Sequence, residues 1–262
     1  MTLWTPANLT SVTLEGYYRV HDPANVLADG SDISTTSSVN TWADQSGNAR
    51  TLTKDGSPTY DANGLSTGHP ALILSFTGFR TAAGAGYPAN AVIGSMVIGT
   101  IDSSTGRLIS LSASGQNDFG FFGHILYQNA GNINYFYNGA IASQTHTPSS
   151  TVAIFEGVPL STTTADVGVN TVLSGTPGTI AGITHDRMGL HSISDTGGSD
   201  CSGSCAEYIL WAGVISTAEL QKLEGYIAWN NGQQALLPGG HPYANAAPTI
   251  DAPTILMPQA LL

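Results

Sequence analysis

Short stretches in which apolar and polar residues alternate make up most of the chain, and this period of two predicts β-strands. In the stretch 133–138, for example, Ile133 and Tyr135 fall on one face while Asn134 and Asn138 fall on the other. Gly, Asn and Asp separate the stretches, as is typical of turns between strands. Strands are predicted over 12–20, 71–76, 91–101, 107–113, 119–127, 133–138, 151–158, 167–173, 187–193 and 207–214.

One segment has a helical period instead. Leu220, Leu223, Tyr226 and Ile227 recur at spacings of three and four and form a single apolar stripe, while Glu224 is expected on the exposed face. This pattern predicts one amphipathic helix over 217–230. We expect it to pack against the edge or end of a β-sandwich.

The start and end of this helix are also signalled. Ser216 followed by Glu219 is a capping-box pattern, in which the serine oxygen accepts from the Glu219 amide and the glutamate reaches back to the Ser216 amide. Gly232 stands where a left-handed C-terminal cap is expected. The helix is therefore predicted from both of its ends as well as from its stripe.

Several segments carry a family resemblance. They are 4–10, the W-x-D-x-S-G-N pattern within 39–50, the stretches 70–72 and 76–78, the strand 206–211, the helix with 223–229, and 237–243. Together they resemble the concanavalin A-like (laminin G-like) lectin/glucanase-fold domains of bacteriophage virion structural proteins. The resemblance implies an all-β jelly-roll sandwich of two antiparallel sheets over 1–243, including the helix 217–230. The residues 244–262, outside the family pattern, are expected to form an extended arm. The resemblance also implies a virion setting, but no particular ligand.

Composition agrees with a turn-rich β protein. The 262 residues include 31 Gly, and only 10% are charged, which fits one sandwich domain. The net charge of −11, with 7 Lys and Arg in total, argues against nucleic acid as a partner, because phosphate binding needs clustered cations. The same charge disfavours anionic membranes.

The first sixteen residues lack the basic region and the continuous apolar region of a signal peptide, and no apolar run approaches the length of a membrane span. The expectation is a protein made in the host cytoplasm that leaves by lysis as part of a virion. An ordinary cytoplasmic protein is the alternative.

Cys201 and Cys205 are the two cysteines of the chain. The three residues between them include a glycine, so the pair could close a small disulfide loop, or it could remain as two thiols. A metal site would need two further soft ligands nearby, and the sequence shows none.

Two segments invite a metal interpretation. Asp44 to Asn48 fits an Asx-type turn with Gly47 or Asn48 left-handed, and calcium is the alternative; one Asp is too few to favour it. His185-Asp186 with His191 could hold a metal, but a turn before a strand is favoured. No metal or other cofactor is therefore predicted.

A glycan site is conceivable on the predicted strand 133–138. If its tyrosine face is open, Tyr135 and Tyr137 offer flat rings for a sugar, and Asn134 and Asn138 offer amides nearby. The favoured alternative is that both tyrosines cover the core.

Catalytic patterns are missing from the sequence. Glycosidases of this fold need two carboxylates that flank the scissile bond, usually in the spacing E-x-D-x-x-E. The sequence has neither this pattern nor a nucleophile elbow or a zinc or phosphate-loop motif. The glutamates are Glu15, Glu156, Glu207, Glu219 and Glu224. Their scatter predicts that the protein is not an enzyme, with a glycoside hydrolase as a distant alternative.

The C-terminal tail places a proline at every fifth position, at Pro248, Pro253 and Pro258, which excludes a helix and disfavours a central strand. It is nevertheless apolar, through Ile250, Ile255, Leu256, Met257, Leu261 and Leu262. Such an arm is expected to lie in a groove. A neighbouring subunit is slightly favoured over the chain's own sandwich.

The leading hypothesis is a non-enzymatic virion structural protein, such as a capsid decoration, collar or fibre-associated subunit. Its expected partners are other virion proteins and further copies of itself, reached through loops and the arm. A carbohydrate-binding module for attachment to a host surface is the second hypothesis, and the two roles can coexist.

Overall fold

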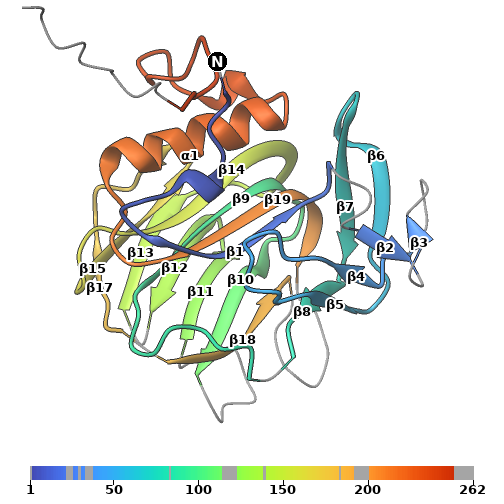
Figure 1. Cartoon of the computed structure of the whole chain (residues 1–262), viewed down its shortest axis with the longest axis horizontal. Helices are drawn as coiled ribbons and strands as arrows, with labels where there is room; N and C mark the ends of the chain where they lie inside the picture. The colour runs from blue at the N-terminus through green and yellow to red at the C-terminus, as the bar shows by residue number, and fades with distance from the viewer. Residues whose placement is uncertain are drawn as a thin grey trace, which may run out of the picture.

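In a computed structural model of the protein, two antiparallel β-sheets pack face to face as a jelly-roll sandwich, as predicted (Figure 1). The structure describes residues 2–21, 26–28, 31–32, 38–82, 84–113, 123–137, 140–182, 184–191 and 201–250. The predicted arm residues Ile255, Leu256, Met257, Leu261 and Leu262 lie outside this part.

The first sheet is formed by segments far apart in the sequence. Its order is β16 (Val172–Leu173), β15 (Thr164–Val169), β14 (Ser149–Pro159), β9 (Ile93–Ile101), β19 (Ser202–Ala212), β7 (His69–Ser75) and β6 (Thr59–Ser66). In addition, β1 (Thr13–Arg19) pairs with β19, and β17 (Gly178–Thr179) pairs with β15. Strand β19 is central, because it pairs with β9 on one side and with β7 and β1 on the other.

The second sheet contains several short strands that the sequence did not predict. Its order is β13 (Ala140–Thr145), β12 (Asn132–Tyr137), β11 (Gly123–Asn129), β10 (Thr105–Ala113), β18 (His185–Leu190), β8 (Gly78–Arg80), β5 (Leu52–Asp55), β4 (Thr41–Trp42), β2 (Val26–Ala28) and β3 (Ser31–Asp32). Strands of two to four residues carry too little periodicity to be recognised from the sequence. Trp42 lies fully buried between the sheets.

Helix α1 (Thr217–Asn230) lies across the outer face of the first sheet, above β14, β9 and β19 (Figure 1). It does not lie at the edge or end of the sandwich, so that prediction is wrong. Leu223 and Ile227 are completely buried against Met96 and Ile209 of the sheet, in a second core separate from the one between the sheets. Burial of each such side chain stabilises the fold by about 1.5–3 kcal/mol.

The predicted capping box forms only in part. Ser216 Oγ accepts from the Glu219 amide at 3.3 Å, as predicted. The Glu219 carboxylate, however, accepts from the amides of Thr10 at 2.7 Å and Ser11 at 2.9 Å and from both hydroxyls. The helix start is thereby tied to the N-terminal segment, and these hydrogen bonds outweigh the effect of burial and lower the pKa of Glu219.

The end of the helix follows the prediction. Gly232 has φ of +65°, its amide donates to the Trp229 carbonyl, and the Gln233 amide donates to the Ala228 carbonyl. This is the pattern of a Schellman cap, which favours glycine at the left-handed position. A further 3-10 turn, η3 (Gln234–Leu236), follows, and another, η1 (Pro6–Asn8), lies near the N-terminus.

Cys201 and Cys205 are buried and are not joined by a disulfide. Four residues along an extended strand span about 13 Å, which exceeds the reach of about 7 Å between the Cα atoms of a disulfide. Because Cys205 is paired within β19 to both Leu72 and Gly99, the strand cannot fold back to close the loop. The disulfide alternative is therefore wrong in this structure.

The segment 44–48 is the predicted Asx turn. The Asp44 carboxylate accepts four hydrogen bonds, from the amides of Tyr17, Ser46 and Arg50 and from the Ser46 hydroxyl, at 2.8–3.2 Å. Gly47 supplies the left-handed residue, with φ of +93°. The carboxylate thus anchors β1 to this loop and is engaged by protein donors, which leaves the calcium alternative without support.

His185 and Asp186 do not form the predicted turn, because both lie in strand β18. His185 begins strand β18, and burial lowers the pKa of both His185 and His191 to about 4. Within the described residues, no group of three or more His, Cys, Asp or Glu side chains could hold a metal ion.

Replacing Glu219 by Gln should lower the free energy of unfolding by about 1–3 kcal/mol at pH 7, because the new amide group faces backbone donors. The pKa of Glu219 is lowered in the folded state, so its contribution is present above its ordinary value of 4.5 and is lost as the pH falls through the lower folded value. Urea unfolding at pH 7 and pH 3 measures the loss of stability and its dependence on pH. The exposed neighbour Thr217→Ala is the control, and an unchanged stability of Glu219→Gln at pH 7 would contradict the anchor.

Candidate functional site

Of the four predicted glycan residues, Asn134 and Tyr135 on β12 are buried and present no open face. Tyr135 is 1% exposed, its hydroxyl donates to the Ile93 carbonyl at 2.6 Å, and its ring packs on Gly157 of the facing sheet. Asn134 is also buried and accepts a hydrogen bond from the Ser143 hydroxyl at 2.7 Å. Tyr135 therefore belongs to the core, as the favoured alternative predicted. The Tyr137 side chain and Asn138 lie outside the described residues.

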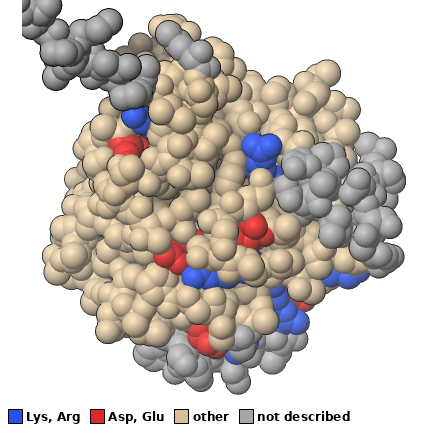
Figure 2. Space-filling view, in the orientation of Figure 1, with Lys and Arg blue, Asp and Glu red and all other residues tan. Residues whose placement is uncertain are grey.

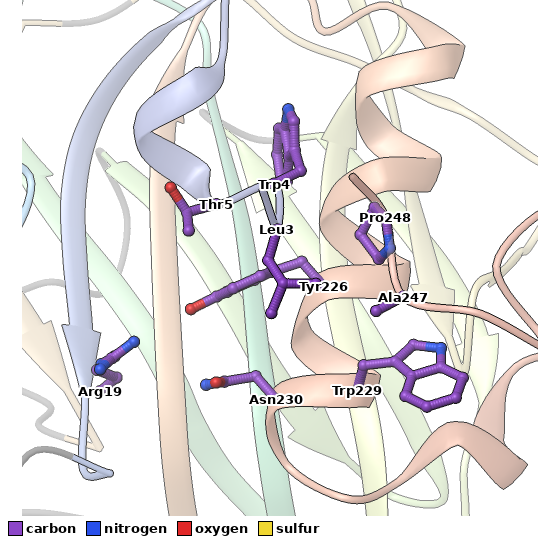
Figure 3. A pocket seen from close by; sticks show the side chains of 9 residues that line it. All are labelled: Leu3, Trp4, Thr5, Arg19, Tyr226, Trp229, Asn230, Ala247 and Pro248. Atoms are coloured by element: carbon purple, nitrogen blue, oxygen red, sulfur yellow. The ribbon is translucent and has the colours of Figure 1, made fainter. Parts of the chain in front are cut away.

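A pocket of about 350 Å³ lies instead on the helix side of the first sheet (Figure 3). It opens between α1, the end of β1 and the two terminal segments of the described chain. Its lining residues are Leu3, Trp4, Thr5, Arg19, Tyr226, Trp229, Asn230, Ala247 and Pro248. We refer to it as the helix pocket.

One wall of the helix pocket is formed by pairing of the chain ends. Leu3 and Thr249 form an antiparallel bridge. The Trp4 amide donates to the Pro248 carbonyl at 3.0 Å, and the Ile250 amide donates to the Thr2 carbonyl at 2.9 Å. The wall thus depends on backbone hydrogen bonds between segments about as far apart as the sequence allows.

The polar side of the helix pocket combines groups from β1 and α1. The Arg19 guanidinium interacts with the hydroxyls of Tyr17 and Tyr226, which hydrogen-bond to each other. Figure 3 shows Arg19, the Tyr226 hydroxyl and the Asn230 amide directed toward one another across the pocket. Burial raises the pKa of both tyrosines far above the ordinary value of 10.0, so their hydroxyls stay protonated.

A buried carboxyl group lies behind this polar side. Glu207 of β19 is completely buried, and the side-chain amides of Asn230 and Asn231 donate to its Oε2 atom at 2.8 and 2.7 Å. Burial raises the pKa of Glu207, and the two amide donors offset part of that rise. Glu207 holds Asn230 in place but does not itself line the pocket.

The apolar side consists of Leu3, Trp4, Ala247 and Pro248. Leu3 is 61% exposed at the pocket, whereas Trp4 is buried and meets the Tyr226 ring edge-on at 6.2 Å between centroids. The Trp229 indole points away from the pocket in Figure 3 and donates to the Tyr243 carbonyl at 2.8 Å.

A mixed lining of this kind suits a small ligand with one polar and one apolar face. The sequence did not predict any of these residues as a site. Tyr226 carried only the signal of a core position on the helix, and Arg19 carried none. Only the packing of α1 over β1 brings the two together.

A second polar cluster lies under the helix and away from the pocket. Glu224, which was predicted to be exposed, is instead buried, and its carboxylate is hydrogen-bonded to His241 Nε2 at 2.9 Å. Glu156 of β14 is completely buried, and its burial together with the neighbouring Glu224 raises its pKa well above the ordinary value. This cluster has no opening in common with the helix pocket and contributes no lining residue to it.

Comparison with solved structures defines the fold. Domain 4 of AbnA, a GH43 extracellular arabinanase from Geobacillus stearothermophilus, solved in complex with arabinotriose, is similar with a TM-score of 0.54 at 13% identity, over 82% of this chain and 100% of that domain. The chain has the β-sandwich fold. A Trypanosoma rangeli sialidase (TM-score 0.54, 11% identity, 87% of this chain and 36% of that one) and the receptor-binding domain of botulinum neurotoxin D (0.51, 11%, 81% and 52%) are also similar.

No protein-family description matches the chain, and no curated protein matches it. The chain spans about a third to a half of the length of the sialidase and neurotoxin chains. At this level of identity, the likeness establishes the fold alone.

Replacing Glu156 by Gln should flatten the dependence of stability on pH. The folded-state pKa of Glu156 is raised, so its stabilising contribution is complete below the ordinary value of 4.5 and is lost as the pH rises toward the folded value. The variant should therefore match the wild type at pH 4 and exceed its free energy of unfolding by at least about 1 kcal/mol at pH 8. Urea unfolding across this range measures the difference, and Glu219→Gln should show the opposite trend. A larger loss of stability in Glu156→Gln at pH 8 than at pH 4 would contradict the assignment.

Proposed function

We propose that the protein is a non-enzymatic carbohydrate-binding domain of a bacteriophage virion, and that the helix pocket receives the sugar. The observation that carries this proposal is the two-sided lining of the pocket. Arg19, Asn230 and the Tyr226 hydroxyl can meet sugar hydroxyls, while Leu3 and Pro248 can meet the C–H face of the ring.

The similar structures support the same class of ligand. The arabinanase domain was solved with arabinotriose and the sialidase with a nononic acid derivative. No carboxylate is among the residues that line the helix pocket, whereas hydrolysis of a glycosidic bond needs a pair of them. For this reason we propose binding and not hydrolysis.

The virion setting is proposed from the sequence resemblance. One of the segments that carry it, 4–10, contributes Trp4 and Thr5 to the helix pocket, and the helix segment 223–229 contributes Tyr226.

Most of the face in Figure 2 carries no charged side chain, and the few Lys and Arg side chains on it are scattered. Within the described residues, no helix is long and apolar enough to cross a membrane.

Filling the helix pocket should abolish glycan binding without disturbing the fold. Ala247 lines the pocket, whereas its neighbour Ala246 is exposed outside it, so Ala247→Trp blocks the space and Ala246→Trp is the matched control. On a glycan array, the wild type and Ala246→Trp should bind the same glycans, and Ala247→Trp should lose at least about tenfold in affinity. Equal binding by all three proteins would exclude this pocket, and no binding by any would exclude the function.

A virion structural subunit is the second candidate, and the exposed apolar chain ends favour it. Leu3 is 61% and Ile250 39% exposed, and both belong to the paired terminal segments, where the predicted docking arm begins. Exposed apolar side chains of this size in neighbouring positions are typical of surfaces that contact a partner. The partner would be another virion protein or a second copy of this chain.

A chain that ends at Ile250 tests this candidate. It keeps the pairing of Leu3 with Thr249 and the helix pocket, and it lacks residues 251–262 of the predicted arm. The full chain should co-sediment with particles that lack the protein, and the shortened chain should not, while both bind the same glycans. Equal co-sedimentation of the two chains would show that residues 251–262 of the arm are not the docking element.

A further inference from the structure

A positively charged side chain, Arg19, lines the helix pocket, and positively charged residues are few in this chain. The chain has 7 Lys and Arg against 18 Asp and Glu. Arg19 is partly exposed at the pocket, where it extends from the last residue of β1 toward α1 (Figure 3). An arginine in this position adds a positive charge where the rest of the lining is neutral.

Arg19 is held by neutral groups and not by a carboxylate. The groups that interact with its guanidinium include the Tyr17 and Tyr226 hydroxyls. Within the described part of the chain, Arg50 pairs with Glu15 at 2.8 Å and Arg187 with Asp186 at 3.6 Å, but Arg19 forms no such ion pair. The positive charge of Arg19 is therefore fixed in direction by the tyrosines without being neutralised at contact distance.

The buried carboxyl group of Glu207 interacts with the Arg19 charge, but the two form no ion pair at contact distance within the described residues. Glu207 is directed to the amides of Asn230 and Asn231, which occupy its Oε2 atom. A guanidinium has five N–H donors in a planar fork, and the two tyrosine hydroxyls cannot occupy all of them. The remaining donors suit two oxygens of one planar anion, because carboxylates match this fork with two parallel hydrogen bonds.

We infer that the helix pocket selects a sugar that carries a carboxylate, such as a uronic acid at the end of a glycan, with the carboxylate on Arg19 and the ring against Leu3 and Pro248. This inference rests on the proposed carbohydrate binding and names its substrate class. The pocket volume of about 350 Å³ lies near the lower end of the range for ligand sites, which favours one terminal sugar over a longer stretch of chain.

The test compares two ligands that differ only in the carboxyl group. Calorimetry with the full chain measures binding of a disaccharide that ends in glucuronic acid and of the same disaccharide after reduction of the carboxyl to an alcohol. The acidic form should bind about 10- to 100-fold more tightly, the range expected for charge-assisted hydrogen bonds. Because this comparison uses the unaltered protein, it does not depend on whether a variant folds.

Variants then assign the preference to Arg19. Arg19→Gln should remove the preference for the acidic form, and Arg19→Lys should retain part of it, because lysine keeps the charge but not the fork. Lys54→Gln, in β5 of the other sheet, removes the same charge away from the pocket and should leave the preference unchanged.

The outcomes separate the inference from the proposed function. Equal binding of the two disaccharides, or array binding that Ala247→Trp abolishes but that involves only neutral glycans, overturns the inference and leaves carbohydrate binding intact. A 6-sulfated disaccharide that binds as tightly as the glucuronic acid form overturns the choice of a carboxylate. Absence of all glycan binding by the wild type overturns both.

Discussion

The central strands of the first sheet are apolar on both faces, and the sandwich alone can cover only one of them. Every residue of β9 is buried, with Val97 directed into the core between the sheets and Met96 and Ile98 directed outward. The outward side chains need a second apolar layer. Helix α1 supplies this layer. The helix pocket and the paired segments 2–4 and 248–250 lie beside it.

The cover is fixed by contacts with segments far away in the sequence. Glu219 takes its hydrogen bonds from Thr10 and Ser11, and the N-terminal segment in turn pairs with residues that follow the helix. Charged hydrogen bonds of this kind contribute more than neutral ones. The helix is therefore held by the N-terminal segment, and this segment pairs with residues 248–250 to form the pocket wall.

Placing a helix over a sheet also buries polar groups, and the protein joins several of them in hydrogen-bonded pairs. Tyr17 is hydrogen-bonded to Tyr226, Asn230 and Asn231 donate to Glu207, and His241 is hydrogen-bonded to Glu224. A buried polar group without a partner would cost about 1–3 kcal/mol. At the helix pocket Arg19 is directed toward Tyr226 and Asn230 of the same network, so the buried polar network and the proposed binding surface share residues (Figure 3).

The sequence by itself determined the elements whose signal is local. The period of two predicted most of the longer strands, and the stripe, Ser216 and Gly232 predicted α1 over Thr217–Asn230. The Asx turn at Asp44 followed from the hydrogen bonds that a short side chain makes with its own neighbours. These predictions succeeded because each depends on residues within one turn or one strand.

Only the tertiary structure decided which face the helix covers, where Glu219 finds its donors, and which residues line the helix pocket. Arg19, Tyr226 and Pro248 lie in three separate segments, and their meeting depends on strand pairing and helix packing across about 230 residues of chain. The hydrophobic pattern along the chain predicts on which side of its own helix or strand a residue lies. It cannot give the partner across the interface, because that partner is selected by the packing of all the elements together.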